Sequence, residues 1–328
     1  MKILILPYTR GSFWNAPPWF SERLRKEFPQ IEVVQLSDFD QVEGRIRDAE
    51  IVVTWSLRPE QFNAAAKLRW IHSPAAAVHQ LMFPELIKSD VILTNGREVH
   101  GATVAEHVIA LIFALAKKLP LSMRCQEKHV WGQNQVWESQ PQPREVSGAT
   151  LGLVGLGSIG TEVAKRASAL GMRVIAVRNR VEAEKPDNVE QVYASSQIDL
   201  MSGQSDYVVL AAPLTSSTTG MINAARLASM KPAGYLINVS RGQLVDESAL
   251  AEALRSRKIA GAALDVFEKE PLALESPLWD LENLLITPHT AGFTEKLWDK
   301  HYAFFMENLR RYLSHQPLLA VVDKSRGY

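Results

Sequence analysis

Blocks of apolar residues alternate with amphipathic stretches along the whole chain. Short apolar runs rich in β-branched residues predict buried strands, and apolar residues at helical spacing predict helices between them. Over the first hundred residues this pattern predicts strands at Lys2–Leu6, Ile31–Gln35, Ile51–Trp55, Arg69–His72 and Val91–Thr94. Strands this apolar do not face water, so they indicate a parallel sheet with helices on both faces.

The alternation restarts near Ala149 and predicts a second group of strands. These are Thr150–Val154, Arg173–Val177, Tyr207–Ala211, Tyr235–Val239, Ala262–Asp265 and Leu284–Thr287. Six strands with helices between them complete a doubly wound unit. Between the two groups, His100–Leu119 is apolar nearly all round and predicts one long buried helix, whereas Gln133–Ser147 predicts a loop.

We therefore predict the α/β class, with two doubly wound parallel-sheet domains, one flavodoxin-like and one a Rossmann domain. The segment Thr294–Leu313 predicts a helix that returns to the first domain, which makes that domain discontinuous. The predicted boundaries are residues 1–98 with 294–328 for the flavodoxin-like domain, and residues 99–293 for the Rossmann domain.

Charge and composition narrow the range of partners. The 36 Lys and Arg residues balance 36 Asp and Glu residues, so no basic face is expected for nucleic acid or an anionic membrane. Cys125 is the single cysteine, and no cluster of metal-ligating residues accompanies His100 or His107. The longest apolar run, Val108–Ala116, is shorter than the ~20 residues that span a bilayer. We expect a cytoplasmic protein without a metal, nucleic-acid or membrane partner.

A glycine motif follows the first strand of the second group. The segment Gly155-Leu-Gly157-Ser-Ile-Gly160 matches G-x-G-x-x-G between a strand and a helix, the context in which this motif binds a dinucleotide. Gly155 permits the tight turn, Gly157 lets the pyrophosphate approach the backbone, and Gly160 allows close packing of helix on strand. The pyrophosphate would accept hydrogen bonds at the helix start, from Ser158 and Ile159. A glycine turn without a ligand is the alternative, which this context disfavours.

The end of the next strand indicates which dinucleotide binds. An acidic residue about 20 positions after the motif holds the ribose of NAD in proteins of this kind. This chain has Arg178-Asn-Arg180 at that place, and a guanidinium can grip a 2′-phosphate through two hydrogen bonds. We predict that NADP(H) is preferred, with Arg178 and Arg180 at the 2′-phosphate, and that NAD(H) is possible. The alternative is that both arginines are solvated.

Polar side chains follow each of the last three predicted strands. They are Arg241, then Glu268 and Glu270, then His289. Because ligands bind beyond the carboxyl ends of strands in open α/β sheets, these groups are expected to converge. Reduction of a 2-keto acid needs a cation for the substrate carboxylate and a proton donor for the keto oxygen. Arg241 suits the first role, and His289 beside Glu268 or Glu270 suits the second. Taken singly, each residue also fits a purely structural role.

Several segments, in this order along the chain, resemble the D-isomer-specific 2-hydroxyacid dehydrogenases. They are Asn95 with Thr103-Val-Ala-Glu106, Val154-Gly-Leu-Gly-Ser-Ile-Gly160, Ala212-Pro-Leu-Thr215, Asn238-Val-Ser-Arg-Gly242, Leu264-Asp-Val-Phe-Glu-Lys-Glu-Pro271 and Thr287-Pro-His289. The resemblance extends over nearly the whole chain, and several motifs in order are more specific than any one of them.

The resemblance implies a role for each of these residues. Arg241 would bind the substrate, His289 would be the acid/base catalyst, and Glu270 rather than Glu268 would be its partner. Asp265 would contact the nicotinamide carboxamide. The other implied cofactor contacts are Thr103, Ala212, Pro213, Val239 and Gly292. Family members are typically homodimers joined through the nucleotide domain, so a homodimer is expected.

Two segments depart from the family pattern. The substrate loop, which usually contains glycine, reads Ser73-Pro-Ala-Ala-Ala-Val-His79, so the implied carboxylate-binding amides are those of Ala76, Ala77 and Val78. Alanine disfavours a positive φ, which predicts a loop of different shape. The second departure, Arg178, resembles the NADPH-using glyoxylate/hydroxypyruvate reductases.

These observations predict an NADP(H)-dependent D-2-hydroxyacid dehydrogenase that works chiefly as a reductase of small 2-keto acids. One alternative is a dimeric NAD(P)-sensing protein, like the co-repressors that share this fold. Another is a phosphoglycerate- or phosphite-type dehydrogenase. The phosphite enzymes place a lysine in the substrate loop, which Ser73–His79 lacks.

Overall fold

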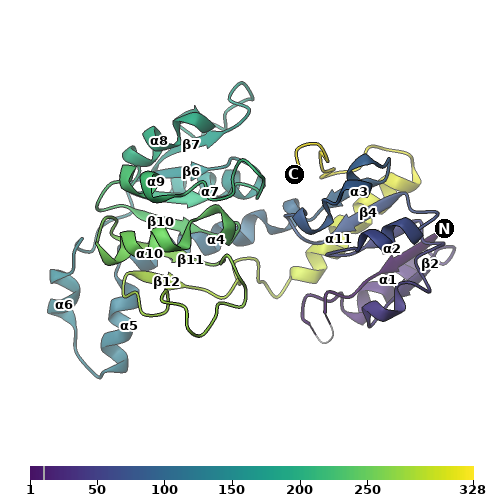
Figure 1. The fold of residues 1–328 in the computed structure, drawn as a ribbon, viewed down its shortest axis with the longest axis horizontal. Coiled ribbons are helices and arrows are strands. Elements are labelled where there is room, and N and C mark those ends of the chain that lie inside the picture. The colour runs from purple at the N-terminus through teal and green to yellow at the C-terminus, as the bar shows by residue number, and fades with distance from the viewer. Residues whose placement is uncertain (10–11) are drawn as a thin grey trace. The chain divides into compact units, whose positions relative to one another are not determined.

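The chain forms two compact units in a computed structural model that describes residues 1–9 and 12–328 (Figure 1). Unit 1 contains Met1–His100 and Thr294–Tyr328, and unit 2 contains Gly101–Phe293. The chain therefore leaves unit 1, builds unit 2 without interruption and returns. The sequence predicts one domain boundary after residue 98 and the other after residue 293.

Unit 1 is built on a parallel sheet. Its described strands pair in the order β2-β1-β3-β4-β5, which is the order of flavodoxin-like folds. They are β1 (Lys2–Ile5), β2 (Glu32–Gln35), β3 (Ile51–Val53), β4 (Trp70–Ser73) and β5 (Ile92–Asn95). Each lies within two residues of a predicted strand, because β-branched and aliphatic side chains fill both faces of this sheet.

Helices cover both faces of the sheet in unit 1. They are α1 (Pro18–Glu27), η1 (Phe39–Gln41), α2 (Pro59–Ala64), η2 (His79–Leu81), α3 (Pro84–Lys88) and α11 (Leu297–Leu313). α1 and α11 share one apolar cluster with the sheet, in which Phe20 and Phe305 are buried against Ile5. The other cluster contains Leu81 and Leu86. Helix α11 thus belongs to unit 1 although it follows unit 2 in the chain.

Strand β4 carries a fully buried histidine, His72. Its Nδ1 lies 2.9 Å from the Thr94 hydroxyl oxygen, which also accepts a 2.8 Å hydrogen bond from Trp70 Nε1. The Thr94 hydroxyl thus contacts both rings, and burial favours the neutral form of the imidazole. Burial lowers the pKa of His72 to about 3. His301 on α11 is also buried, and burial lowers its pKa below the ordinary range.

We expect acid to destabilise the protein through His72. The pKa in the folded chain lies below the unfolded value near 6.5, so the stabilisation is present above pH 6.5 and is lost as the pH falls toward 3. Between pH 7.5 and 5.5 the free energy of unfolding should fall by about 1.4 kcal/mol from this group alone. Urea titrations at both pH values measure the effect. His72→Gln should reduce this pH dependence, and exposed His315→Gln should not; equal slopes in the two variants would contradict the assignment.

Unit 2 is built on a second parallel sheet, whose described strands pair in the order β12-β11-β10-β9-β6-β7-β8. The strands are β6 (Thr150–Val154), β7 (Arg173–Arg178), β8 (Gln191–Ala194), β9 (Tyr207–Leu210), β10 (Tyr235–Asn238), β11 (Gly261–Leu264) and β12 (Leu284–Ile286). This is the doubly wound dinucleotide-binding order extended by one strand. The predicted fold class is confirmed for both units.

The helices of unit 2 flank this sheet. They are α4 (Arg97–Ala116, which begins in unit 1), α5 (Leu119–Glu127), α6 (Gln133–Glu138), α7 (Ser158–Ala169), η3 (Ser195–Gln197), α8 (Ile198–Gln204), α9 (Ala224–Ser229), η4 (Gly242–Leu244) and α10 (Glu247–Arg255). α4 and α7 share one apolar cluster with the sheet, and α8, α9 and α10 share the other.

Three predictions for this unit were wrong. The six-strand sheet omitted β8, a short edge strand in which Tyr193 is the one buried side chain, so its pattern is weak. The single helix His100–Leu119 is instead α4 followed by α5, because Pro120 has no N–H to continue a helix and a turn forms at Lys118 with φ 58°. The predicted loop Gln133–Ser147 begins with the short helix α6.

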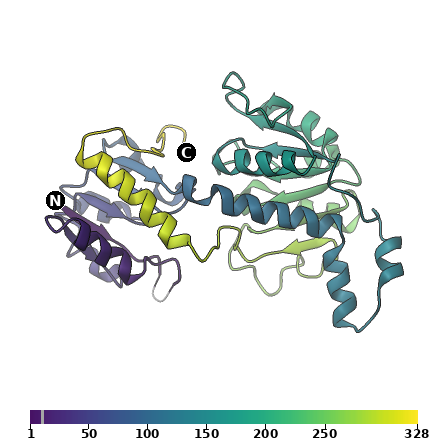
Figure 2. The same cartoon turned by 180° about the vertical axis from the view of Figure 1, so that it is seen from behind.

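Helix α4 lies across one face of the second sheet (Figure 2). Of the helices in the described part of the chain, only α4 has the length and the apolar composition of a membrane-spanning helix. Its side chains at Val104, Val108, Leu111 and Ile112 are buried against the sheet. A helix buried in the core of a protein has the same length and composition, so packing against the sheet explains the apolar character of α4.

Candidate active site

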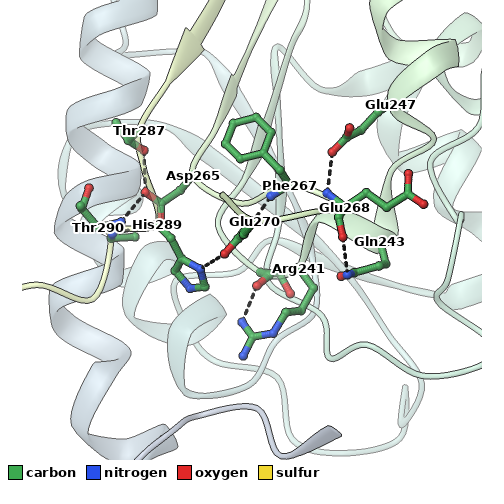
Figure 3. Close-up of polar contacts among 12 residues, drawn as sticks. Arg241, Gln243, Glu247, Asp265, Phe267, Glu268, Glu270, Thr287, His289 and Thr290 are labelled. Atoms are coloured by element: carbon green, nitrogen blue, oxygen red, sulfur yellow. Dashed lines mark hydrogen bonds and ion pairs between the residues drawn. The ribbon is translucent and has the colours of Figure 1, made fainter. Parts of the chain in front are cut away.

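The polar residues singled out from the sequence gather at one edge of the second sheet. Arg241 follows β10, Asp265 follows β11 and His289 follows β12, all at the carboxyl ends of parallel strands (Figure 3). The glycine motif follows β6 and Arg178 ends β7, at the same edge. This is the edge at which open α/β sheets bind ligands.

His289 and Glu270 form a close pair. His289 Nδ1 lies 2.6 Å from Glu270 Oε2, and Glu270 Oε1 accepts a 2.9 Å hydrogen bond from Phe267 N–H. Glu268 is exposed, and its N–H donates instead to Glu247 Oε1 at 2.6 Å (Figure 3). Of the two carboxylates that spacing left open, the structure brings Glu270 to the imidazole.

The surroundings of Glu270 keep it ionised. Burial raises the pKa of its carboxyl group, but hydrogen bonds from His289 and Phe267 N–H, with the charges of His289 and Arg241, lower it by more. The net result is a pKa below the ordinary value. Glu270 can therefore accept a hydrogen bond from the imidazole at any pH near neutrality.

Asp265 anchors the loop that carries His289. Its side chain is 1% exposed and accepts hydrogen bonds from the Thr287 hydroxyl at 2.6 Å and from Thr290 N–H at 2.9 Å. It also accepts one from Ala291 N–H at 3.0 Å. These bonds hold His289 at φ 54°, a left-handed backbone that costs energy and persists where surrounding contacts enforce it. The predicted contact of Asp265 with the nicotinamide stays a prediction.

Two positioning residues were not predicted. His107 on α4 places Nε2 3.1 Å from the Thr287 hydroxyl, and burial lowers its pKa while Asp265 opposes this. Asn238 is fully buried at the end of β10, and its side-chain amide donates to the Arg241 carbonyl at 2.9 Å. A buried amide at a strand end is the sequence signal that points to Asn238. No local signal identifies His107, whose partner lies 180 positions away.

The glycine motif fits a bound pyrophosphate. Gly155 has φ 101°, and a Cβ there would lie 2.7 Å from the Ala211 carbonyl oxygen. A Cβ at Gly160 would lie 2.2 Å from the Gly155 carbonyl oxygen, so both glycines are required by packing. At Gly157 a Cβ would meet nothing within 4 Å, which leaves the space that a phosphate group needs. The first amides of α7, at Ser158 and Ile159, are placed to bind it.

The remaining predicted cofactor residues follow other strands of this sheet or lie on α4. Ala212 and Pro213 follow β9, Val239 follows β10, Gly292 follows β12 and Thr103 lies on α4. Arg178 donates to the carbonyl oxygens of Ala183 and Glu184, whereas Arg180 is exposed. The Arg178 guanidinium is thus held by its own loop at the place where a 2′-phosphate is expected.

The substrate loop belongs to unit 1. No described residue from Pro74 to Val78 has a positive φ, so alanine is accommodated without backbone strain. Asn95 Nδ2 donates to the Ala76 carbonyl at 2.6 Å. Within the described chain, the amides of Ala76, Ala77 and Val78 donate to no protein acceptor. Their binding of a substrate carboxylate stays a prediction.

The fold and the site define a class, the nicotinamide-dependent oxidoreductases that pair an imidazole and a carboxylate with an arginine. Residues 109–291 match the family described as D-isomer specific 2-hydroxyacid dehydrogenase, NAD binding domain. The chain belongs to the D-isomer specific 2-hydroxyacid dehydrogenase family, whose members are NAD(P)-dependent oxidoreductases.

Relatives within this family carry different names. A glyoxylate reductase from Korarchaeum cryptofilum is 35% identical over 272 residues, covering 81% of this chain and 80% of the relative. A D-3-phosphoglycerate dehydrogenase from Synechocystis is 34% identical over 260 residues, covering 79% of this chain and 46% of the relative. This chain thus spans about half the length of that dehydrogenase.

A solved structure of the family is similar over the full length. It is an NADPH-dependent glyoxylate/hydroxypyruvate reductase from Sinorhizobium meliloti, in complex with NADP and sulfate. The two chains share 28% identity with a TM-score of 0.83, and the match covers 100% of this chain and 99% of the other.

Proposed function

We propose that this protein is an NADP(H)-dependent, D-isomer-specific reductase of small 2-keto acids, of the glyoxylate/hydroxypyruvate type. The observation that carries the proposal is the 2.6 Å pair of His289 and Glu270, which lies at the same sheet edge as Arg241 and the glycine motif. The names of the glyoxylate reductase relatives support the choice of substrate class. NAD(H) is the second candidate cofactor.

Each side chain of the site has a distinct task in this reaction. When bound, the reduced nicotinamide supplies the hydride for the keto carbon. Glu270 accepts the hydrogen bond of His289 Nδ1–H and so leaves Nε2 to give its proton to the keto oxygen. Arg241 binds the substrate carboxylate and polarises the carbonyl. Asp265 keeps the imidazole in place through its loop.

Oxidation of NADPH, followed by absorbance with glyoxylate and with hydroxypyruvate, tests the function. Turnover with either acid, faster than with NADH, supports the proposal. Turnover restricted to 3-phosphohydroxypyruvate would instead favour the phosphoglycerate dehydrogenase reaction, after which the Synechocystis relative is named. NADPH binding without turnover across a panel of 2-keto acids would contradict the reductase and favour a dinucleotide-sensing protein.

Arg178 is expected to set the cofactor preference. Arg178→Asp should raise the KM for NADPH by roughly 10- to 100-fold, because it removes charge-assisted hydrogen bonds to the 2′-phosphate and adds repulsion. The KM for NADH should change far less. Steady-state kinetics with both cofactors measure the ratio, and Arg45→Asp, at an exposed position of unit 1, is the matched control. An unchanged ratio of kcat/KM values for the two cofactors would show that Arg178 does not contact the phosphate.

We also propose a homodimer formed through unit 2. The segment α5–α6 projects from this unit (Figure 2), and neither helix contains a buried residue in the single chain. Trp131 and Trp137 on this segment are 90% and 65% exposed. Large exposed aromatic side chains in one segment mark a surface that another chain covers. Sedimentation equilibrium should give twice the 36.6 kDa of one chain, and a single-chain mass would contradict the dimer.

A further inference from the structure

Two side chains outside the catalytic set hold the backbone of Glu268 at both of its polar groups. Glu247, the first residue of α10, accepts a 2.6 Å hydrogen bond from the Glu268 N–H through Oε1. Gln243, in η4, donates a 2.9 Å hydrogen bond from Nε2 to the Glu268 carbonyl oxygen. Figure 3 shows both contacts beside the pair of His289 and Glu270. One residue of the loop that follows β11 is therefore fixed at its donor and at its acceptor.

The same loop lies directly against the segment that carries Arg241. A Cβ at Gly242 would lie 1.8 Å from the Phe267 carbonyl carbon and 2.2 Å from the Glu268 nitrogen, so no side chain fits between the two backbones. The side chain of Phe267 is buried in the apolar core of unit 2. The peptide that joins Phe267 to Glu268 is thus held by packing as well as by hydrogen bonds.

This peptide is linked to the catalytic pair through Glu270. Phe267 N–H donates a 2.9 Å hydrogen bond to Glu270 Oε1, and Glu270 Oε2 lies 2.6 Å from His289 Nδ1. The loop that Glu247 holds therefore supplies both the carboxylate and an amide that orients it. A shift of the loop would move the carboxylate away from the imidazole, and a misplacement of about 1 Å at a catalytic group can cost roughly 10² in rate.

The capping of α10 does not account for the position of Glu247. The N-cap of this helix is Asp246, whose side chain accepts a 2.9 Å hydrogen bond from Ala249 N–H. Burial raises the pKa of the Glu247 carboxyl group, the hydrogen bond from Glu268 N–H lowers it, and the charges of Glu268 and Glu270 raise it again. The net result is a pKa above the ordinary value. A carboxylate kept half-buried near two others is unfavourable, and its bond to the loop offsets this cost.

We propose that Glu247 and Gln243 are positioning residues of the reductase: through the Glu268 backbone they hold the catalytic carboxylate at its imidazole. The inference rests on the proposed function, because it concerns the same acid–base pair. Loss of either hydrogen bond lowers the fraction of molecules in which the pair is formed. The turnover number should therefore fall, whereas the KM for NADPH should not change.

Variants on α10 test the role of Glu247. Glu247→Ala removes the acceptor of the Glu268 N–H and should lower kcat for hydroxypyruvate roughly tenfold. Glu247→Gln keeps an oxygen acceptor at the same place and should recover most of the loss. Glu252→Ala, at an exposed position of the same helix, is the matched control and should retain kcat. A normal kcat in Glu247→Ala would overturn the proposal.

A double-variant cycle separates positioning from a general loss of structure. In a chain that already carries Glu270→Ala, Glu247→Ala should cause no further loss of kcat, because the carboxylate through which it acts is gone. The same tenfold loss in both backgrounds would overturn the proposal. Should Glu247→Ala fail to fold, Gln243→Ala replaces it in the cycle, with an expected loss of about threefold in the unmodified background only.

Hydrogen exchange at the Glu268 amide tests the contact without turnover. Exchange should be faster in Glu247→Ala than in the unmodified chain and in Glu252→Ala, because the amide has lost its acceptor. Equal exchange in the three chains would overturn the proposal. This measurement keeps the two inferences apart, since failure of the unmodified chain to reduce any 2-keto acid contradicts the proposed function and leaves the exchange rates unaffected.

Discussion

Replacing His289 with Ala is expected to lower kcat for 2-keto acid reduction by a factor of about 10²–10⁴. The keto oxygen gains negative charge as hydride arrives, and without the imidazole only water is left to protonate it. NADPH affinity should be unchanged, because no cofactor contact is assigned to His289. Steady-state kinetics give kcat, and fluorescence titration gives the cofactor affinity. A variant with near-normal kcat would show that another group supplies the proton.

The two glutamates after β11 provide a matched comparison for this prediction. Glu270→Gln removes the charge that faces His289 Nδ1, whereas Glu268→Gln alters an exposed side chain two positions away. We expect the first variant to lose roughly tenfold or more in kcat and the second to retain it. Equal losses in the two variants would contradict the assignment of Glu270 as the partner of the imidazole.

The fold could be predicted largely from local pattern. Buried parallel strands such as Ile51–Val53 consist of consecutive β-branched residues, and this composition is visible without any tertiary contact. β8 was missed for the converse reason, because an edge strand with one buried side chain lacks that pattern. The break between α4 and α5 was visible in principle at Pro120, but the apolar run on both sides of it favoured one helix.

The sequence predicts which residues belong to the site, but it does not predict the contacts between them. Strand ends placed Arg241, Asp265 and His289 at one edge because parallel strands share their carboxyl ends. Spacing alone did not separate Glu268 from Glu270. What distinguishes the two glutamates is a contact with Glu247, an α10 residue 21 positions earlier, whose carboxylate accepts the hydrogen bond of the Glu268 N–H. The anchoring of the His289 loop by Asp265 likewise depends on contacts between distant segments.

Replacing Arg241 with Ala is expected to lower kcat/KM for 2-keto acids by about 10²–10⁴. A guanidinium that holds a carboxylate through two charge-assisted hydrogen bonds contributes about 1.5–3 kcal/mol for each. Arg241→Lys should recover only part of the loss, because an ammonium group keeps the charge but not the paired geometry. The backbone position is set by Asn238, which holds the Arg241 carbonyl at 2.9 Å, so truncating the side chain should leave the loop intact.

The choice of substrate separates this role from a general loss of structure. Glycolaldehyde has a carbonyl group but no carboxylate, so of the two contacts that Arg241→Ala removes it can use only the one to the carbonyl. The variant and the unmodified chain should therefore reduce glycolaldehyde at rates that differ much less than their rates with hydroxypyruvate. If both substrates lose equally, Arg241 acts on the carbonyl or on the fold rather than on the carboxylate. If neither loses, the substrate carboxylate is bound elsewhere, and the amides of Ala76, Ala77 and Val78, which have no acceptor among the described residues, are the next groups to test.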